Sequence, residues 1–158
     1  MSIQKPVFSW PLRVYYEDTD LSSVVYHANY LKFCERARTE WLRALGCSQE
    51  RLRHEVQVVF TVSHVEVVFR APARLDDELD ATVVVTELKR ASLVLSQELR
   101  IRGEAGRLLA TAAVRVASVD AATFRPTALP PLFRKLLSVD PAASCAATAP
   151  IPTREETE

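Results

Sequence analysis

The spacing of apolar residues changes near residue 56, and this change separates a helical segment from a strand-rich one. Between residues 29 and 45 apolar side chains recur every three or four positions, as on one face of an α-helix. These positions are Tyr30, Cys34, Ala37, Trp41 and Leu45. Asn29 has the residue type of an N-cap and Gly46 that of a C′ stop. The pattern therefore predicts one long amphipathic helix from about Asn29 to Leu45.

Shorter elements are predicted on either side of this helix. The segment Arg13–Glu17 is rich in β-prone residues and follows Pro11, which predicts a first strand. Ser48 can cap a short second helix from Gln49 to about His54.

After residue 56 apolar and polar residues alternate, which is typical of strands. The parity of this alternation changes once, between the group Val56, Val58, Phe60 and Val62 and the group Val65, Val67 and Phe69. The switch predicts a bulge or break near Ser63 and His64. Pro72 ends this strand, and three further strands are predicted over 78–88, around 93–101 and over 107–119, before a short helix from residue 132 to about 137.

One helix and one antiparallel sheet should pack as two layers of an α+β domain. Several strands carry apolar residues at both parities, such as Leu108 with Leu109, and a single helix cannot cover both faces of a sheet. We therefore expect a second subunit on the other face or on an edge. Residues 1–140 are predicted to form this single domain, and residues 141–158, rich in Ala, Pro and Thr, a disordered tail.

Composition removes several classes of function. The chain has 158 residues, and its 20 Lys and Arg balance its 20 Asp and Glu, so net charge gives no bias towards nucleic acid. The three cysteines are an odd number without a CxxC spacing, which predicts reduced thiols and neither disulfides nor a zinc site. No apolar run has the length of a signal peptide core or a membrane span, so we expect a cytoplasmic protein.

Groups capable of chemistry are concentrated between Tyr15 and Tyr30, where carboxylates and His27 lead into the long helix. Free N–H groups at a helix start can polarise a carbonyl, and a carboxylate ahead of them can attack it or activate a water. Acidic loops before helices also serve as caps and solvated turns, so the residues alone leave both interpretations open. No GxGxxG, P-loop or GxSxG motif is present.

Three motifs in this region resemble the hotdog-fold acyl-CoA thioesterases, most clearly the YbgC group associated with the Tol-Pal system and related to 4-hydroxybenzoyl-CoA thioesterase. They are VYYEDTD at 14–20, VVYHANY at 24–30 and ERARTE at 35–40. The later runs APARLDD at 71–77, SLV at 92–94 and RP at 125–126 match the same group, so the resemblance spans about residues 8–137. It implies a hotdog fold, in which a five-stranded antiparallel sheet wraps around one long central helix. It also implies a cytoplasmic homo-oligomer, either a dimer or a homotetramer.

The same resemblance implies roles for individual residues. Asp20 falls at the family's catalytic aspartate and would act as nucleophile or general base. His27 falls at the family's helix-entry position and would be the second catalytic residue, with its backbone N–H facing the thioester carbonyl and its imidazole orienting substrate or water. The substrate-binding positions would be Tyr16, Val25, Tyr26, Ala28, Lys89 and Arg90, with Lys89 and Arg90 able to hold a CoA phosphate. CoA belongs to the substrate, and no metal or other cofactor is implied.

The chain departs from the family between the aspartate and the helix, where Leu21-Ser22-Ser23 replaces the small residues, often Ala-Gly-Gly, of close relatives. Two other functions stay open at this point. One is a hotdog hydratase or dehydratase acting on acyl-CoA or acyl-carrier protein. The other is a low-activity scaffold that binds envelope or lipid-synthesis partners.

Overall fold

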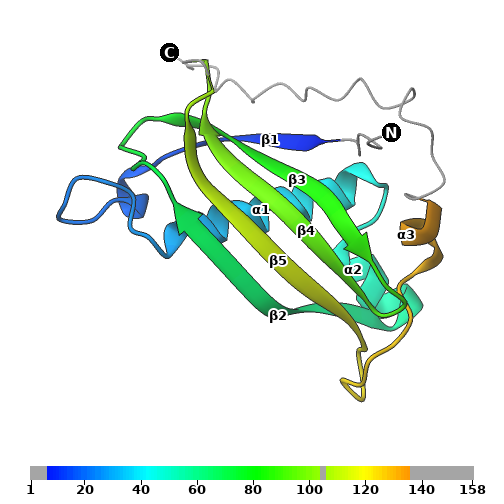
Figure 1. Cartoon of the computed structure of the whole chain (residues 1–158). Helices are drawn as coiled ribbons and strands as arrows, with labels where there is room; N and C mark the ends of the chain where they lie inside the picture. Colours follow the sequence, from blue (N-terminus) through cyan, green and yellow to red (C-terminus); the bar gives the residue numbers. More distant parts are fainter. Residues whose placement is uncertain (1–6, 104–105, 136–158) are drawn as a thin grey trace, which may run out of the picture.

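A computed structural model describes residues 7–103 and 106–135 of the chain. Their order along the chain begins with one strand and a loop, continues with the long helix, and ends in four consecutive strands (Figure 1). The strands are β1 (Phe8–Arg13), β2 (Val58–Phe69), β3 (Glu78–Leu88), β4 (Ser92–Ile101) and β5 (Leu108–Asp120). The helices are α1 (Asn29–Ala44), α2 (Gln49–Arg51) and α3 (Pro131–Lys135), together with the 3-10 turn η1 (Tyr16–Asp18) and the short π-helix η2 (Leu52–Val56).

All five strands form one antiparallel sheet in the order β1-β3-β4-β5-β2. The sheet curves around α1, which lies across one of its faces (Figure 1). This arrangement confirms the fold that the sequence resemblance implies. β1 and β2 are the two edges of the sheet within one chain.

The core lies between α1 and the concave face of the sheet. Phe33 and Ala37 of α1 are completely buried there. They face an aliphatic surface made by alternate residues of the central strands, among them Leu79, Ala81, Val83, Leu95, Leu99 and Val114. Strict alternation of buried and half-exposed residues along β4 shows why the periodicity of two identified this strand from sequence.

The predicted irregularity in β2 is a β-bulge. The pairing with β5 shifts between Val62 and His64, which leaves Ser63 as the extra residue. Val62 lies opposite Val116 and Val65 opposite Val114, and both partners are buried. The parity switch in the sequence therefore keeps the apolar residues of both halves of β2 on the side that faces α1.

The predicted first strand is wrong in position. β1 runs from Phe8 to Arg13, and Tyr16–Asp18 forms a 3-10 turn. Pro11 lies inside β1 because this strand is an edge, where a residue without an N–H group can be accommodated. A proline inside the alternation of Phe8, Trp10 and Leu12 concealed the strand.

The other elements agree with their predictions to within a few residues, and the predicted end of the last helix near residue 137 lies outside the described residues. The short second helix continues through η2 to Val56, and Ser48 caps it by accepting a hydrogen bond from the Arg51 N–H. Gly46 has the left-handed φ of +82° that a helix C′ position favours. The predicted disordered tail lies outside the described residues.

Candidate active site

The loop between β1 and α1 has two legs and a tip. One leg contains Asp18 and Thr19, the other Val25 and Tyr26, and a β-bridge joins Thr19 to Val25. Residues 20–24 form the tip, which is the blue loop at the left of Figure 1. Asp20 is therefore the first residue of an exposed turn that is closed by its own backbone pairing.

Asp20 is exposed, and its hydrogen bonds to the described residues stay within the tip. Its Oδ1 atom accepts a hydrogen bond of 2.7 Å from the Ser22 N–H. Its backbone N–H donates to the Val24 carbonyl, and its own carbonyl accepts from Ser23. These contacts fix the direction of the side chain. The Oδ2 atom has no hydrogen-bond partner in the described part of the chain, so the carboxylate can meet a substrate from solvent.

The start of α1 differs from its prediction, because Asn29 is not the N-cap. Ala28 occupies that position, and no side chain caps the helix. The Asn29 side chain is buried and donates instead to the Asp18 carbonyl at 3.0 Å. The amide that would have capped the helix therefore ties it to the loop, and the first N–H groups are left uncapped.

Two backbone donors remain at this helix start. The N–H groups of Asn29, Tyr30 and Leu31 bond to carbonyls three residues earlier. Those of His27 and Ala28 have no acceptor among the residues that the structure describes. Together with the positive end of the helix dipole, such donors can stabilise an oxyanion.

The predicted site residues take different positions around this start. The His27 imidazole is exposed and packs edge-on against Tyr26, with ring centroids 4.6 Å apart. Tyr16 is 83% exposed and Tyr26 46%, so both phenol rings can contact a ligand. Val25 is only 4% exposed, so its side chain belongs to the core.

Lys89 and Arg90 lie far from Asp20 within one chain. The β3–β4 turn that carries them is at the opposite end of β3 from the loop, roughly 35 Å along the strand from Glu78. Lys89 pairs there with Glu87 at 3.0 Å. A role for this turn in binding a CoA phosphate stays a prediction, and it requires a second subunit to bring the turn close to a loop.

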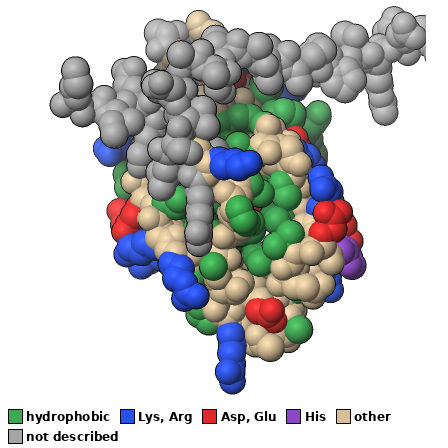
Figure 2. All heavy atoms as spheres, turned by 90° about the vertical axis from the view of Figure 1, so that its right-hand side faces the viewer, with side chains coloured by type: hydrophobic (Ala, Val, Ile, Leu, Met, Phe, Trp, Pro, Cys, Tyr) green, Lys and Arg blue, Asp and Glu red, His purple; other side chains and the backbone are tan. Residues whose placement is uncertain are grey.

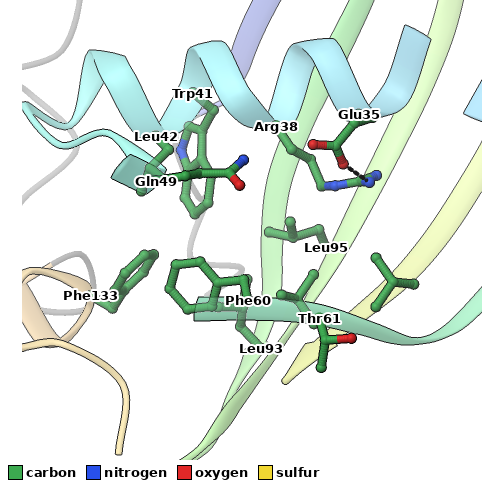
Figure 3. Close-up of a pocket in the computed structure, with 12 residues that line it drawn as sticks. Glu35, Arg38, Trp41, Leu42, Gln49, Phe60, Thr61, Leu93, Leu95 and Phe133 are labelled. Atoms are coloured by element: carbon green, nitrogen blue, oxygen red, sulfur yellow. Dashed lines mark hydrogen bonds and ion pairs between the residues drawn. The ribbon is translucent and has the colours of Figure 1, made fainter. Parts of the chain in front are cut away.

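A separate pocket of about 80 Å³ opens between the second half of α1 and the sheet. Figure 3 shows its apolar walls, which include Leu42, Phe60 and Phe133, with Arg38 pointing towards the space. Arg38 pairs with Glu35 and also donates to the buried Gln97 at 2.9 Å. None of the lining residues comes from the loop, so in one chain the pocket and Asp20 are separate features.

The face of the molecule at the right of Figure 1 is shown in Figure 2. Apolar side chains gather near its centre, and most charged side chains lie towards its edge. α2 and α3, which contribute Gln49 and Phe133 to the pocket, lie on this side. The molecule therefore places its apolar hollow and its polar loop at opposite ends.

Sequence reasoning missed the partners of Asp18, Asn29 and Tyr30. Asp18 is 3% exposed and accepts the Tyr15 N–H at its Oδ2 atom, so it shapes the loop from inside. The Tyr30 hydroxyl accepts the Ala73 N–H at 2.9 Å, and burial raises the pKa of this phenol. The only signal in the sequence was their place in the VYYEDTD and VVYHANY motifs, which says nothing about partners.

Two further properties concern the described residues as a whole. No helix among them is both long and apolar enough to span a bilayer. No three His, Cys, Asp or Glu side chains of this part of the chain gather closely enough to hold a metal ion.

Comparison with known proteins identifies the class to which this fold and loop belong. The Thioesterase superfamily model matches residues 22–107. The acyl-CoA thioester hydrolase YbgC of Escherichia coli is 48% identical over 124 residues, which cover 78% of this chain and 90% of that protein. The acyl-CoA thioesterase YbgC of Haemophilus influenzae is 46% identical and covers 78% of this chain and 88% of its own length.

Solved structures of similar proteins agree with this class and with the fold. A "probable thioesterase" from Bartonella henselae has a TM-score of 0.74 at 36% identity and covers 79% of this chain and 100% of its own. A 1,4-dihydroxy-2-naphthoyl-CoA thioesterase from Synechocystis has a TM-score of 0.77 at 23% identity, covers 84% of this chain and 96% of its own, and supports the fold. The chain therefore belongs to the thioesterase superfamily, and within it to the YbgC group.

Proposed function

We propose that this protein hydrolyses acyl-CoA thioesters with Asp20 as its catalytic carboxylate. Membership of the YbgC group supplies the reaction class. The observation that carries the residue assignment is the exposed Asp20 carboxylate on a loop that is tied to an uncapped helix start. The N–H groups of His27 and Ala28 are the proposed donors to the thioester carbonyl oxygen.

Two chemical routes use these groups. In the first, an Asp20 oxygen attacks the carbonyl carbon, the oxyanion is held by the two N–H groups, and CoA leaves as thiolate. Water then hydrolyses the mixed anhydride, which releases the acid and restores the carboxylate. In the second, Asp20 takes a proton from a water that attacks the same carbon, and the collapse of the tetrahedral intermediate expels the thiolate. Borohydride added during turnover separates the routes, because only the mixed anhydride is reduced to homoserine at position 20.

Replacing Asp20 by Asn tests the assignment. The amide keeps the shape of the side chain and removes its charge, so we expect turnover of acyl-CoAs to fall about 1,000-fold or more, with unchanged melting temperature. The measurement is release of free CoA thiol from short, long and aromatic acyl-CoAs. Glu17→Gln is the matched control, since Glu17 is an exposed acid of the same loop and should keep nearly full activity. Full activity in Asp20→Asn would rule out the assignment.

A homo-oligomer is the second part of the proposal. On the side of β2 that faces α1, Val62, Val65 and Phe69 remain 47%, 41% and 50% exposed in one chain. A row of exposed apolar side chains along an edge strand favours association, and a second copy of the chain would cover it. Cytoplasmic location, a link to the Tol-Pal system and use of acyl-carrier protein stay predictions.

A further inference from the structure

The first turn of α1 carries two buried polar side chains, and each holds one leg of the catalytic loop. Asn29 and Tyr30 are 6% and 3% exposed. We propose that they act as a clamp, defined here as these two residues, which sets the position of Asp20 relative to the helix start. This inference rests on the proposed function, because it concerns the same carboxylate.

Asn29 holds the first leg. Its Nδ2 atom donates to the Asp18 carbonyl at 3.0 Å, and the same carbonyl accepts the Tyr26 N–H at 2.8 Å. The Tyr26 carbonyl in turn accepts the Asn29 N–H at 2.8 Å. The leg that precedes Asp20 is therefore fixed to the helix start through a short ring of three hydrogen bonds, and the bond from the Asn29 side chain is buried.

Tyr30 holds the second leg through the segment before β3. Its hydroxyl accepts the Ala73 N–H at 2.9 Å. The Ala73 carbonyl accepts the Val25 N–H, also at 2.9 Å, and Ala73 is completely buried. One residue, Ala73, thus links the tyrosine to the leg that follows the tip.

The tip has no comparable attachment of its own. Within the described part of the chain, the hydrogen bonds of Asp20 go only to Ser22, Ser23 and Val24. Its distance from the N–H groups of His27 and Ala28 is consequently set by the two legs. Because a displacement of about 1 Å in a reacting group can cost about 100-fold in rate, loosening either leg should lower turnover. Asn29 and Tyr30 are thus positioning residues, since neither touches the reacting atoms.

Tyr30→Phe and Asn29→Ala test the clamp. Each removes one side-chain hydrogen bond, and Tyr30→Phe changes nothing else in the shape of the core. We expect kcat for acyl-CoA hydrolysis to fall about 10-fold in each variant, with KM within about twofold, because the substrate contacts are kept while the carboxylate is misplaced. Hydrogen exchange of the Val25 and Tyr26 amides should accelerate, while exchange at Val114 in the sheet should not.

Ser118→Ala is the matched control. Ser118 is fully buried and donates from its hydroxyl to the Ala128 carbonyl, away from the loop. Its loss should lower the melting temperature without lowering kcat. The clamp is overturned if both loop variants keep kcat within twofold of the original protein, or if Ser118→Ala loses as much kcat as they do. Tyr30→Phe decides the matter alone if Asn29→Ala does not fold.

Asp20→Asn, measured in parallel, separates this inference from the proposed function. Loss of turnover in Asp20→Asn with full turnover in both clamp variants refutes the clamp and leaves Asp20 as the catalyst. Full turnover in Asp20→Asn refutes the proposed function and, with it, the assignment of the clamp to catalysis.

Discussion

The loop tip and the inner side of β2 both expose side chains to solvent, but for different physical reasons. Apart from the fully exposed Leu21, the tip exposes a carboxylate and two serines, which cost little in water, and in the proposed reaction a substrate must reach the carboxylate. β2 exposes Val62, Val65 and Phe69, which gain free energy when they are covered. Exposure therefore has to be interpreted by residue type, since we propose that one region is open for chemistry and the other for association.

The largest expected effect is loss of the proposed association through β2. Val65→Asp places a charge on the side of β2 that we propose a second copy covers, where its burial without a partner would be costly. We expect the oligomer to dissociate to the mass of one chain in light scattering after size exclusion. Val68→Asp is the matched control, because Val68 is similarly exposed but lies opposite Thr111, on the other side of the same strand. Dissociation of both variants, or of neither, would contradict the distinction between the two sides.

A smaller effect is expected on kcat when the His27 side chain is removed. In the proposal the group of residue 27 that donates a hydrogen bond to the thioester carbonyl oxygen is the backbone N–H, which a side-chain substitution leaves in place. His27→Ala removes only a contact of the imidazole with substrate or water, so it should lower kcat by about 10-fold at most, the value of one net hydrogen bond, and far less than Asp20→Asn. Thiol-release assays on the two variants give the ratio. A loss in His27→Ala that equals the loss in Asp20→Asn would mean that the imidazole itself is essential.

The smallest effect concerns the backbone of the tip. Ser23 has a φ of +63°, in the left-handed region that favours glycine. Ser23→Gly should relieve a strain of about 1 kcal/mol, partly offset by the greater freedom of glycine in the unfolded chain, so the net gain in unfolding free energy is about 0.5 kcal/mol.

Thermal unfolding measures this gain, with Ser22→Gly as control. Ser22 is not among the residues of positive φ, so its replacement should lower stability. Equal shifts in the two variants would show that the left-handed conformation carries no strain. In the Leu21-Ser22-Ser23 departure from the family, the expected effect on stability thus comes from Ser23, while Leu21 at the tip is fully exposed.

The sequence predicted most of the sheet and little of the network around the loop. β3, β4 and β5 were found because their residues alternate between a buried and an open face, a property of each strand by itself. The bulge at Ser63 was found for the same reason. β1 was misplaced because it contains Pro11, which has no N–H group to donate. An edge strand tolerates this loss, but whether a strand lies at the edge depends on the whole sheet and cannot be inferred from the strand alone.

In the candidate site, too, some features could be predicted from local sequence and others depend on the whole fold. Asp20 and His27 could be named because their motif is characteristic of the family, and they lie on the loop and at the helix start as expected. The partner of Asn29 could not be named, because an asparagine at the start of a helix can cap the helix or reach a carbonyl elsewhere. Only the fold brings the Asp18 carbonyl within 3.0 Å of its amide.

The bulge in β2 also bears on how this protein avoids uncontrolled assembly. A twelve-residue edge strand with apolar side chains would otherwise offer a long straight row of backbone groups to any extended peptide. An extra residue at its midpoint bends the strand and increases its local twist. A foreign strand can then follow only about half of the edge before losing register, whereas a surface shaped to the bend can follow all of it.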